Sequence, residues 1–324
     1  MKKIVIVFSG CILLAVGCTK ENKSDENFEA ADEVIVTSGR CASQEMLTLQ
    51  LQQDPGLAAR MESIEQATQR FIKNPNNSFL SGGNVVISVV VNVLYRTAAE
   101  NVSAAQIQSQ IDVLNADFTA TNADYNNTPS FFQSVKSGDT KVRFVLDLVI
   151  RKATNKSSWR TDNSMKVNSK GGINPTSPSN KLNLWVCNMS GGILGYAQFP
   201  DGSLATDGVV IDDNAFGKTG TAKAPYGLGR TATHEVGHWL NLRHIWGDAT
   251  CGNDFVSDTP LHQTSNGDCP TFPRYGSCSA TVPMMTMNYM DYTYDACMYM
   301  FSLGQSTRMN ATFASGGGRT GFAL

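Results

Sequence analysis

The sequence predicts a mixed α/β (α+β) fold with a regular first part and an irregular last part. Up to about residue 245, short apolar runs bounded by glycine, proline or asparagine alternate with helical patterns. Beyond that point the chain is a loop region dense in Cys, Asp, Pro and Met. The 324 residues suffice for one large or two modest domains with a real core. Only 17% of the residues are charged and the net charge is -2, which argues against nucleic-acid binding.

The N-terminus is typical of an export signal. Met1-Lys2-Lys3 precedes a thirteen-residue apolar run, residues 4–16, which is too short to span a bilayer. The stretch Leu14-Ala15-Val16-Gly17-Cys18 resembles the bacterial lipobox, and this resemblance implies a lipid on Cys18. An ordinary signal peptide with an incidental cysteine is the alternative. Residues 19–27 form a polar tether. We therefore expect an exported protein, anchored only through this lipid at the bacterial outer membrane or cell surface, or released from it.

The elements follow in order along the chain. Apolar residues at helical spacing within 42–70 predict two helices, separated by a turn at Asp54-Pro55-Gly56. Residues 84–95, rich in valine and isoleucine, predict a strand, and residues 103–114 predict a helix with a serine cap. Further short apolar runs predict strands at 142–150, 182–187, 194–199 and 208–211. A short helix near 302–312 closes the chain.

The most informative motif holds three of the four histidines of the chain, in His234-Glu235-Val236-Gly237-His238 and at His244. Residues four apart lie on one helix face, so two imidazoles can bind one metal while Glu235 lies beside a bound water. His244 reaches the same ion only if the chain reverses near Asn241, and asparagine readily adopts positive φ. Three neutral imidazoles leave Zn²⁺ an open position, and Glu235 would act as general base. The alternative is an amphipathic helix with incidental histidines.

This motif and Asn288-Tyr289-Met290-Asp291-Tyr292 together resemble the metzincin clan of metallopeptidases. Supporting stretches narrow the resemblance to the pappalysin family of secreted zinc endopeptidases, in particular its ulilysin-like microbial members; they are residues 182–188, 194–200, 258–260 and 300–305. The resemblance covers about residues 40–308, with asparagine at 241 where metzincins usually have glycine. It implies a mixed twisted sheet and active-site helix in an upper subdomain, and an irregular lower subdomain that carries the Met-turn.

The family resemblance also assigns roles. It implies one catalytic zinc, Met290 as an apolar floor beneath it, and Tyr292 as a hydrogen-bond donor to the tetrahedral intermediate. The alternatives are a core methionine and a packing ring. Residues 195–200 correspond to the edge strand that binds extended protein or peptide substrates. We expect a monomer.

Eight cysteines require assignment. Cys11 leaves with the signal, and Cys187 lies in an apolar run typical of a buried small hydrophobe. Four others cluster as a two-bridge set, for which spacing alone leaves three connectivities open. The family resemblance implies the pairs Cys251–Cys278 and Cys269–Cys297.

Cys41 is a candidate zymogen switch. Arg40-Cys41-Ala42 resembles the segment in metzincin zymogens whose thiolate occupies the fourth zinc position. A free thiol in a flexible tail is the alternative. The resulting organisation is a signal peptide over 1–17, a tether and inhibitory propeptide over 18–59, and a catalytic domain over 60–324. We hypothesise self-cleavage between Ala59 and Arg60.

The resemblance further implies cleavage before arginine or lysine. Asp295 is the candidate base of the S1′ pocket, because a buried carboxylate pairs with guanidinium; a turn-forming surface residue is the alternative. Residues 253–259 offer oxygen ligands for a structural Ca²⁺, with Asp254 and Thr259 the leading candidates. Two other functions stay open: a zinc hydrolase of small amides or peptidoglycan cross-links, and a surface binding module without catalysis.

Overall fold

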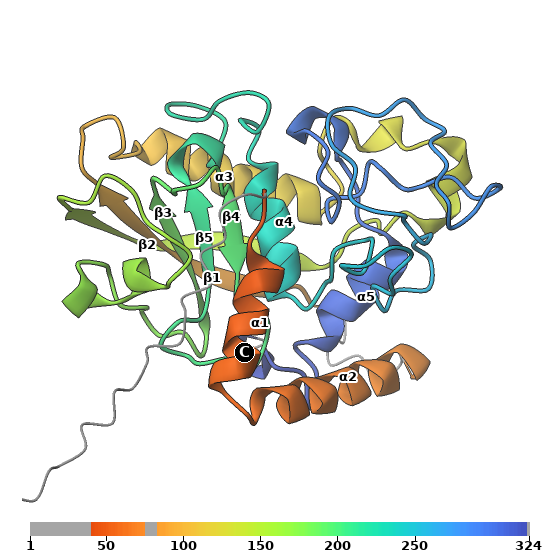
Figure 1. Cartoon of the computed structure of the whole chain (residues 1–324), viewed down its shortest axis with the longest axis horizontal. Helices are drawn as coiled ribbons and strands as arrows, with labels where there is room; N and C mark the ends of the chain where they lie inside the picture. The colour runs from red at the N-terminus through yellow and green to blue at the C-terminus, as the bar shows by residue number, and fades with distance from the viewer. Residues whose placement is uncertain (1–39, 75–82, 323–324) are drawn as a thin grey trace, which may run out of the picture. The chain divides into compact units, whose positions relative to one another are not determined.

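The computed structural model describes residues 40–74 and 83–322 (Figure 1). Each helix and strand expected above is present, with ends shifted by a few residues. In chain order the elements are α1 (Ser43–Gln53), α2 (Leu57–Lys73), β1 (Val85–Tyr95), α3 (Ala104–Phe118), β2 (Val142–Ala153), β3 (Lys181–Cys187), β4 (Gly195–Ala197), β5 (Val209–Asp212), α4 (Arg230–Trp239) and α5 (Leu303–Ala311). Within the two described ranges no helix is long and apolar enough to cross a membrane. The predicted signal peptide, Cys11, Cys18 and the tether lie outside the described residues.

The five strands form one mixed sheet in the order β2-β1-β3-β5-β4. Four strands run parallel, and β4 pairs antiparallel with β5 at the edge. The predicted mixed sheet is therefore confirmed, and so is the edge position of the strand that begins at Gly195. Because β4 is an edge strand, one side of its backbone can pair with another peptide.

Both faces of the sheet are covered. Alternate residues of β1, among them Ile87, Val89 and Val91, are fully buried in a core shared with α3 and α4. Helix α3 starts at the expected cap, since the Ser103 hydroxyl accepts a hydrogen bond from Gln106 N at 3.1 Å. The other face carries a second core, which includes Cys187. Cys187 is 1% exposed, as expected for a buried small hydrophobe.

The chain beyond α4 has little regular structure apart from α5 (Figure 1). Two disulfides join distant points of this segment, Cys251 with Cys278 and Cys269 with Cys297. The pairing implied by the family resemblance is thus the one in the structure. The bridges restrict loops that contain few backbone ladders of their own, which lowers the entropy of the unfolded chain.

The predicted propeptide boundary falls inside a helix. The Ala59–Arg60 bond lies in the first turn of α2, which runs beside α5 and is tied to it by an ion pair of Glu65 with Arg308 at 2.6 Å. Arg60 pairs with Asp54 at 2.6 Å. A peptidase binds extended chain, so cleavage at this bond requires the first turn to unwind.

A buried lysine should make stability depend on pH. Burial lowers the pKa of Lys166 from 10.5 to about 7, and its ammonium donates to Thr206 O at 2.6 Å. Between these pH values the unfolded chain binds the extra proton and the folded chain does not, so stability rises with pH. We expect Lys166→Met to flatten this rise. Urea unfolding at pH 7, 8 and 9, in a Glu235→Ala background that prevents self-cleavage, measures it. An unchanged slope would contradict the prediction.

Candidate metal centre and active site

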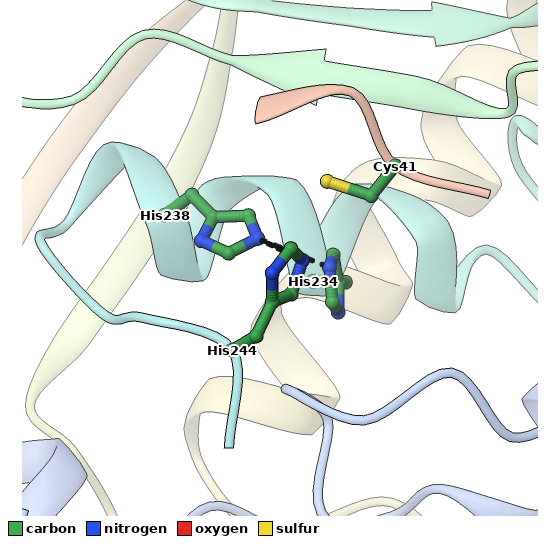
Figure 2. Close-up of side chains that lie close together, drawn as sticks. All are labelled: Cys41, His234, His238 and His244. Carbon is green, nitrogen blue, oxygen red and sulfur yellow. Dashed lines mark hydrogen bonds between the residues drawn. The ribbon is translucent and has the colours of Figure 1, made fainter. Parts of the chain in front are cut away.

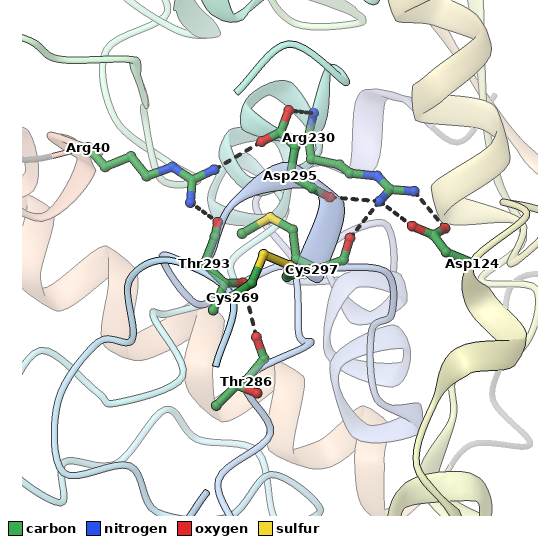
Figure 3. The surroundings of a disulfide bond; sticks show 9 residues. Arg40, Asp124, Arg230, Cys269, Thr286, Thr293, Asp295 and Cys297 are labelled. Carbon is green, nitrogen blue, oxygen red and sulfur yellow. Dashed lines mark hydrogen bonds and ion pairs between the residues drawn. A yellow bond between two sulfur atoms is a disulfide. The ribbon is translucent and has the colours of Figure 1, made fainter. Parts of the chain in front are cut away.

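Helix α4 carries the first two histidines of the motif into the centre of the molecule. Every residue of this helix is buried. Its first residue, Arg230, is held by ion pairs with Asp117 at 3.3 Å and Asp124 at 2.7 Å. Arg230 also donates to the backbone oxygens of Asp295 at 2.9 Å and Met298 at 2.7 Å. The contacts with Asp295 and Met298 hold the start of the helix against the chain that follows the Met-turn (Figure 3).

The chain reverses directly after α4, at the predicted position. Asn241 has φ of 69°, and its N–H and that of Leu242 bond back to His238 O and Gly237 O, each at 2.9 Å. This left-handed residue ends the helix as a glycine would. The reversal returns His244 to the other two histidines, as expected.

The three imidazoles converge on one point. The Nε2 atom of His238 lies 3.1 Å from Nε2 of both His234 and His244 (Figure 2). Cys41 Sγ completes the cluster, because the four ligand atoms lie within 4.8 Å of one another. In the described ranges this is the one such cluster of His, Cys, Asp or Glu found.

Hydrogen bonds on the outer ring nitrogens set the tautomers. His234 Nδ1 faces Tyr289 O at 2.7 Å, His238 Nδ1 faces Leu242 O at 2.8 Å, and His244 Nδ1 faces Asp248 Oδ1 at 2.5 Å. These oxygens accept only, so each Nδ1 carries the proton and each Nε2 presents a lone pair inward. Burial, and next the neighbouring His244, lower the pKa of His234 and His238 well below 6.5. Three neutral imidazoles facing one another fit a zinc ion.

Glu235 lies beside this cluster. Burial raises the pKa of its carboxyl group to about 8. Its Oε2 accepts hydrogen bonds from Ser43 Oγ at 2.8 Å and from Cys41 Sγ at 3.4 Å. Its buried Oε1 has no partner among the described residues. One carboxylate oxygen is therefore held by the N-terminal segment, and the other is available to a reacting molecule.

The Met-turn contacts the chain that carries the histidines. Met290 is fully buried, and its carbonyl oxygen accepts a hydrogen bond from Ile245 N at 3.1 Å. Tyr292 places its hydroxyl 3.1 Å from His244 Nε2 and donates to Cys41 O at 3.3 Å. The roles that the family resemblance gives to both side chains stay predictions.

The close contact of Met290 with α4 requires glycine at position 237. A Cβ on Gly237 would meet Met290 Sδ at 2.5 Å. We expect Gly237→Ala to displace Met290 and lower the free energy of unfolding by roughly 1–3 kcal/mol. Gly267→Ala is the matched control, because its Cβ would meet nothing within 4 Å. Urea unfolding of both zinc-loaded variants checks this, and equal midpoints would refute it.

Asp295 is buried rather than exposed in a surface turn, which removes that alternative. Its side chain is 0% exposed, and its Oδ2 accepts hydrogen bonds from Leu228 N at 2.9 Å and Arg230 N at 3.2 Å. Its Oδ1 lies 3.1 Å from the Arg40 guanidinium.

The two calcium candidates lie next to each other: Asp254 Oδ2 accepts a hydrogen bond from Thr259 Oγ1 at 2.7 Å.

The edge strand β4 is already paired with the N-terminal segment. Leu194 N donates to Arg40 O at 2.9 Å, and Ala42 N donates to Gly195 O at 3.0 Å. Ser43 Oγ accepts from Ala197 N at 2.8 Å. Cys41 is buried within the fold, which excludes the alternative of a thiol in a flexible tail.

Two functional contacts were missed from the sequence. The spacing of Asp248 four residues after His244 could have indicated its contact with the imidazole. Ser43 carries no such signal, because its contact with Glu235 depends on the pairing of its segment with β4.

Comparison with known proteins finds similarity to metalloproteases. The peptidase M43 family profile, described as pregnancy-associated plasma protein-A, matches residues 179–314. An extracellular metalloprotease of Arthroderma benhamiae is 30% identical over 263 residues, which are 77% of this chain and 77% of that protein.

Two solved structures from Tannerella forsythia are similar over most of the chain. Mature mirolysin in complex with a cleaved peptide is 44% identical with a TM-score of 0.72, covering 75% of this chain and 97% of that chain. A promirolysin mutant is 39% identical with a TM-score of 0.79, covering 88% of this chain and 97% of that chain. The proenzyme thus matches more of this chain than the mature enzyme does.

Proposed function

This chain belongs to the pappalysin family (peptidase M43) of zinc metalloproteases, and we propose that it is an extracellular endopeptidase, made as a zymogen, that cleaves proteins before arginine or lysine. The observation that carries the proposal is the set of three inward-facing Nε2 atoms with the free Oε1 of Glu235 beside them. The similarity to promirolysin supports the zymogen.

The side chains around the metal centre suggest how a peptide bond would be hydrolysed. His234, His238 and His244 would hold zinc, which acts as a Lewis acid that polarises a carbonyl and makes water more acidic. Glu235 would accept the proton of the attacking water through Oε1 and pass it to the leaving amine. The Tyr292 hydroxyl would release Cys41 O and donate a hydrogen bond to the oxyanion instead.

Latency would come from residues 41 to 43. The Cys41 thiol faces the three histidines, and its contact with Glu235, like that of Ser43, engages the oxygen Oε2 of the base. Pairing with β4 fills the edge where an extended substrate would add. We propose that cleavage between Ala59 and Arg60 releases this segment, after the first turn of α2 has unwound.

The preference for basic residues would come from Asp295. We expect Asp295→Asn to lose the preference for arginine or lysine after the cut bond, since a neutral amide does not pair with a cation. Asparagine keeps an acceptor for Leu228 N and Arg230 N, which preserves the start of α4. Mass spectrometry of a digested peptide library measures the preference. If the variant still cuts before basic residues, Asp295 does not select them.

Anchoring and calcium complete the proposal. A lipid on Cys18 would keep the enzyme at the cell surface, and the relatives named extracellular support an exported protein. We also propose a structural Ca²⁺ in residues 253–259, where Asp254 and Thr259 offer oxygen ligands of the kind that calcium prefers.

A peptidase is favoured over the alternatives by similarity to a structure that contains a cleaved peptide. The deciding experiment measures zinc content and peptide cleavage by the processed chain. Stoichiometric zinc with cuts that depend on Glu235 supports the proposal. Zinc without cleavage of any peptide would favour the small-amide hydrolase or the binding module.

A further inference from the structure

The segment that contains β4 runs past the metal centre. At its start, a Cβ on Gly195 would lie 3.0 Å from Glu235 Cγ. Two residues beyond the end of β4, the ring centroid of Phe199 lies 5.4 Å from that of His238. The order of Gly195 and Phe199 along this segment therefore follows the order of Glu235 and His238 along α4.

Asp295 lies at the first of these two ends. It pairs with Arg40 at 3.1 Å, and the Arg40 backbone oxygen accepts a hydrogen bond from Leu194 N, directly before β4. The proposed function places the residue after the cut bond at Asp295. The residues before that bond then extend along the segment toward Phe199, because a bound peptide is extended.

Arg243 lies at the Phe199 end of the segment. Its guanidinium lies over the Phe199 ring, 4.5 Å from the centroid. Its buried Nε has no hydrogen-bond partner among the described residues, and its Nη1 donates to Gln44 Oε1 at the long distance of 3.4 Å. A buried donor without a partner is costly, so this guanidinium would gain from an anionic acceptor.

The acids around Arg243 are bound to other partners. Burial, and next the neighbouring Arg308, lower the pKa of Arg243 below its ordinary value of 12.5, whereas two carboxylates raise it. These are Asp248, which contacts His244 at 2.5 Å, and Glu65, which pairs with Arg308 at 2.6 Å. Within the part of the chain that the structure describes, Arg243 has no ion-pair partner of its own.

Residues of the proposed propeptide cover this place. Leu47 and Leu57 pack against Phe199 in a small apolar core, and Gln44 contacts Arg243. Release of the chain up to residue 59 would uncover an aromatic ring with a guanidinium over it. This pair suits a glutamate side chain, whose methylene groups can contact the ring while its carboxylate binds the guanidinium.

We propose that Arg243 and Phe199 form a subsite that selects an acidic side chain at one of the three positions before the cut bond. This inference rests on the proposed function, because it takes Asp295 as the side that receives the residue after that bond. Alternate side chains of an extended peptide point to opposite faces, so the preference is confined to one position and absent at its neighbours. The favoured substrates carry glutamate before the cut bond and arginine or lysine after it.

The test uses the zinc-loaded full chain, processed by a serine peptidase that is then inhibited. The substrates are matched peptides with arginine after the cut bond and either glutamate or its neutral isostere glutamine at each of the three positions before it. The measured quantity is the ratio of kcat/KM for the two peptides. The variants are Arg243→Gln and Arg243→Lys, with Arg96→Gln as control, because Arg96 is an exposed arginine that lies 3.9 Å from Glu100.

We expect the unmodified enzyme to cleave the glutamate peptide about tenfold faster than the glutamine peptide at one position. Arg243→Gln should cleave both equally, Arg243→Lys should keep part of the preference, and Arg96→Gln should keep all of it. Each ratio compares two substrates on the same protein, so a smaller active fraction does not change it.

Equal rates at every position in the unmodified enzyme, or an undiminished preference in Arg243→Gln, would overturn the proposal. If Arg243→Gln is inactive, an undiminished ratio in Arg243→Lys overturns it instead. Cleavage before arginine without a preference for glutamate would sink this inference alone. No cleavage of any peptide by the unmodified enzyme would sink the proposed function, and the inference with it.

Discussion

Replacing Glu235 with alanine is expected to reduce peptide hydrolysis about 10³-fold while the chain keeps its zinc. The carboxylate is fully buried beside the three imidazoles, and its Oε1 has no partner among the described residues. Alanine removes the group that we propose accepts the proton of the attacking water, and it leaves every Nε2 atom in place. In this variant the catalytic rate should therefore fall while zinc binding stays unchanged.

The measurement needs both proteins in processed form. Wild-type and Glu235→Ala chains are treated with the same serine peptidase, which is then inhibited, before turnover and zinc content are compared. Retained turnover in the alanine variant would exclude Glu235 as the base. Loss of zinc together with turnover would show that Glu235 supports the site instead.

Replacing His244 with alanine is expected to abolish tight zinc binding and, with it, activity. This histidine reaches the cluster only through the reversal at Asn241, and it supplies one of three convergent Nε2 atoms. Two remaining imidazoles do not form the three-ligand site that catalytic zinc needs. Zinc competition with a chromophoric chelator gives the change in affinity.

The variant Asp248→Asn should weaken zinc binding only partly. It keeps His244 but replaces the carboxylate that accepts the Nδ1 proton at 2.5 Å, so zinc affinity should fall only about 10- to 100-fold. Equal losses in the two variants would mean that His244→Ala acts by general disruption of the fold. Unchanged affinity in His244→Ala would remove this histidine from the ligand set.

Features set by local spacing could be predicted from the sequence. Three of these features depend on only a few adjacent residues. They are the four-residue spacing of His234 and His238, the turn at Asp54-Pro55-Gly56 and the positive φ of Asn241. The strands were predictable because each contains a short apolar run; β3, β4 and β5 are buried almost throughout, whereas β2 is partly exposed. Their order in the sheet was not predicted, since pairing is decided by contacts between distant segments.

The contacts of the proposed propeptide could be predicted from the sequence only in part. The segment around Cys41 could be identified by its resemblance to zymogen switches, but the partners of Arg40 and Ser43 depend on how this segment pairs with β4. The proposed self-cleavage bond between Ala59 and Arg60 was likewise only partly predictable. The sequence indicates a basic residue at position 60, whereas its place within α2 depends on packing against α5.

The pairing of residues 40–43 with the β4 edge has a consequence for inhibitor design. These four consecutive residues face the three histidines, bond to Glu235, pair with the β4 edge and form an ion pair with Asp295. As a detached tetrapeptide, Arg-Cys-Ala-Ser would lose the high effective concentration that its covalent tether provides. It should inhibit the processed enzyme weakly, and cyclisation that fixes its bound shape should recover much of the lost affinity.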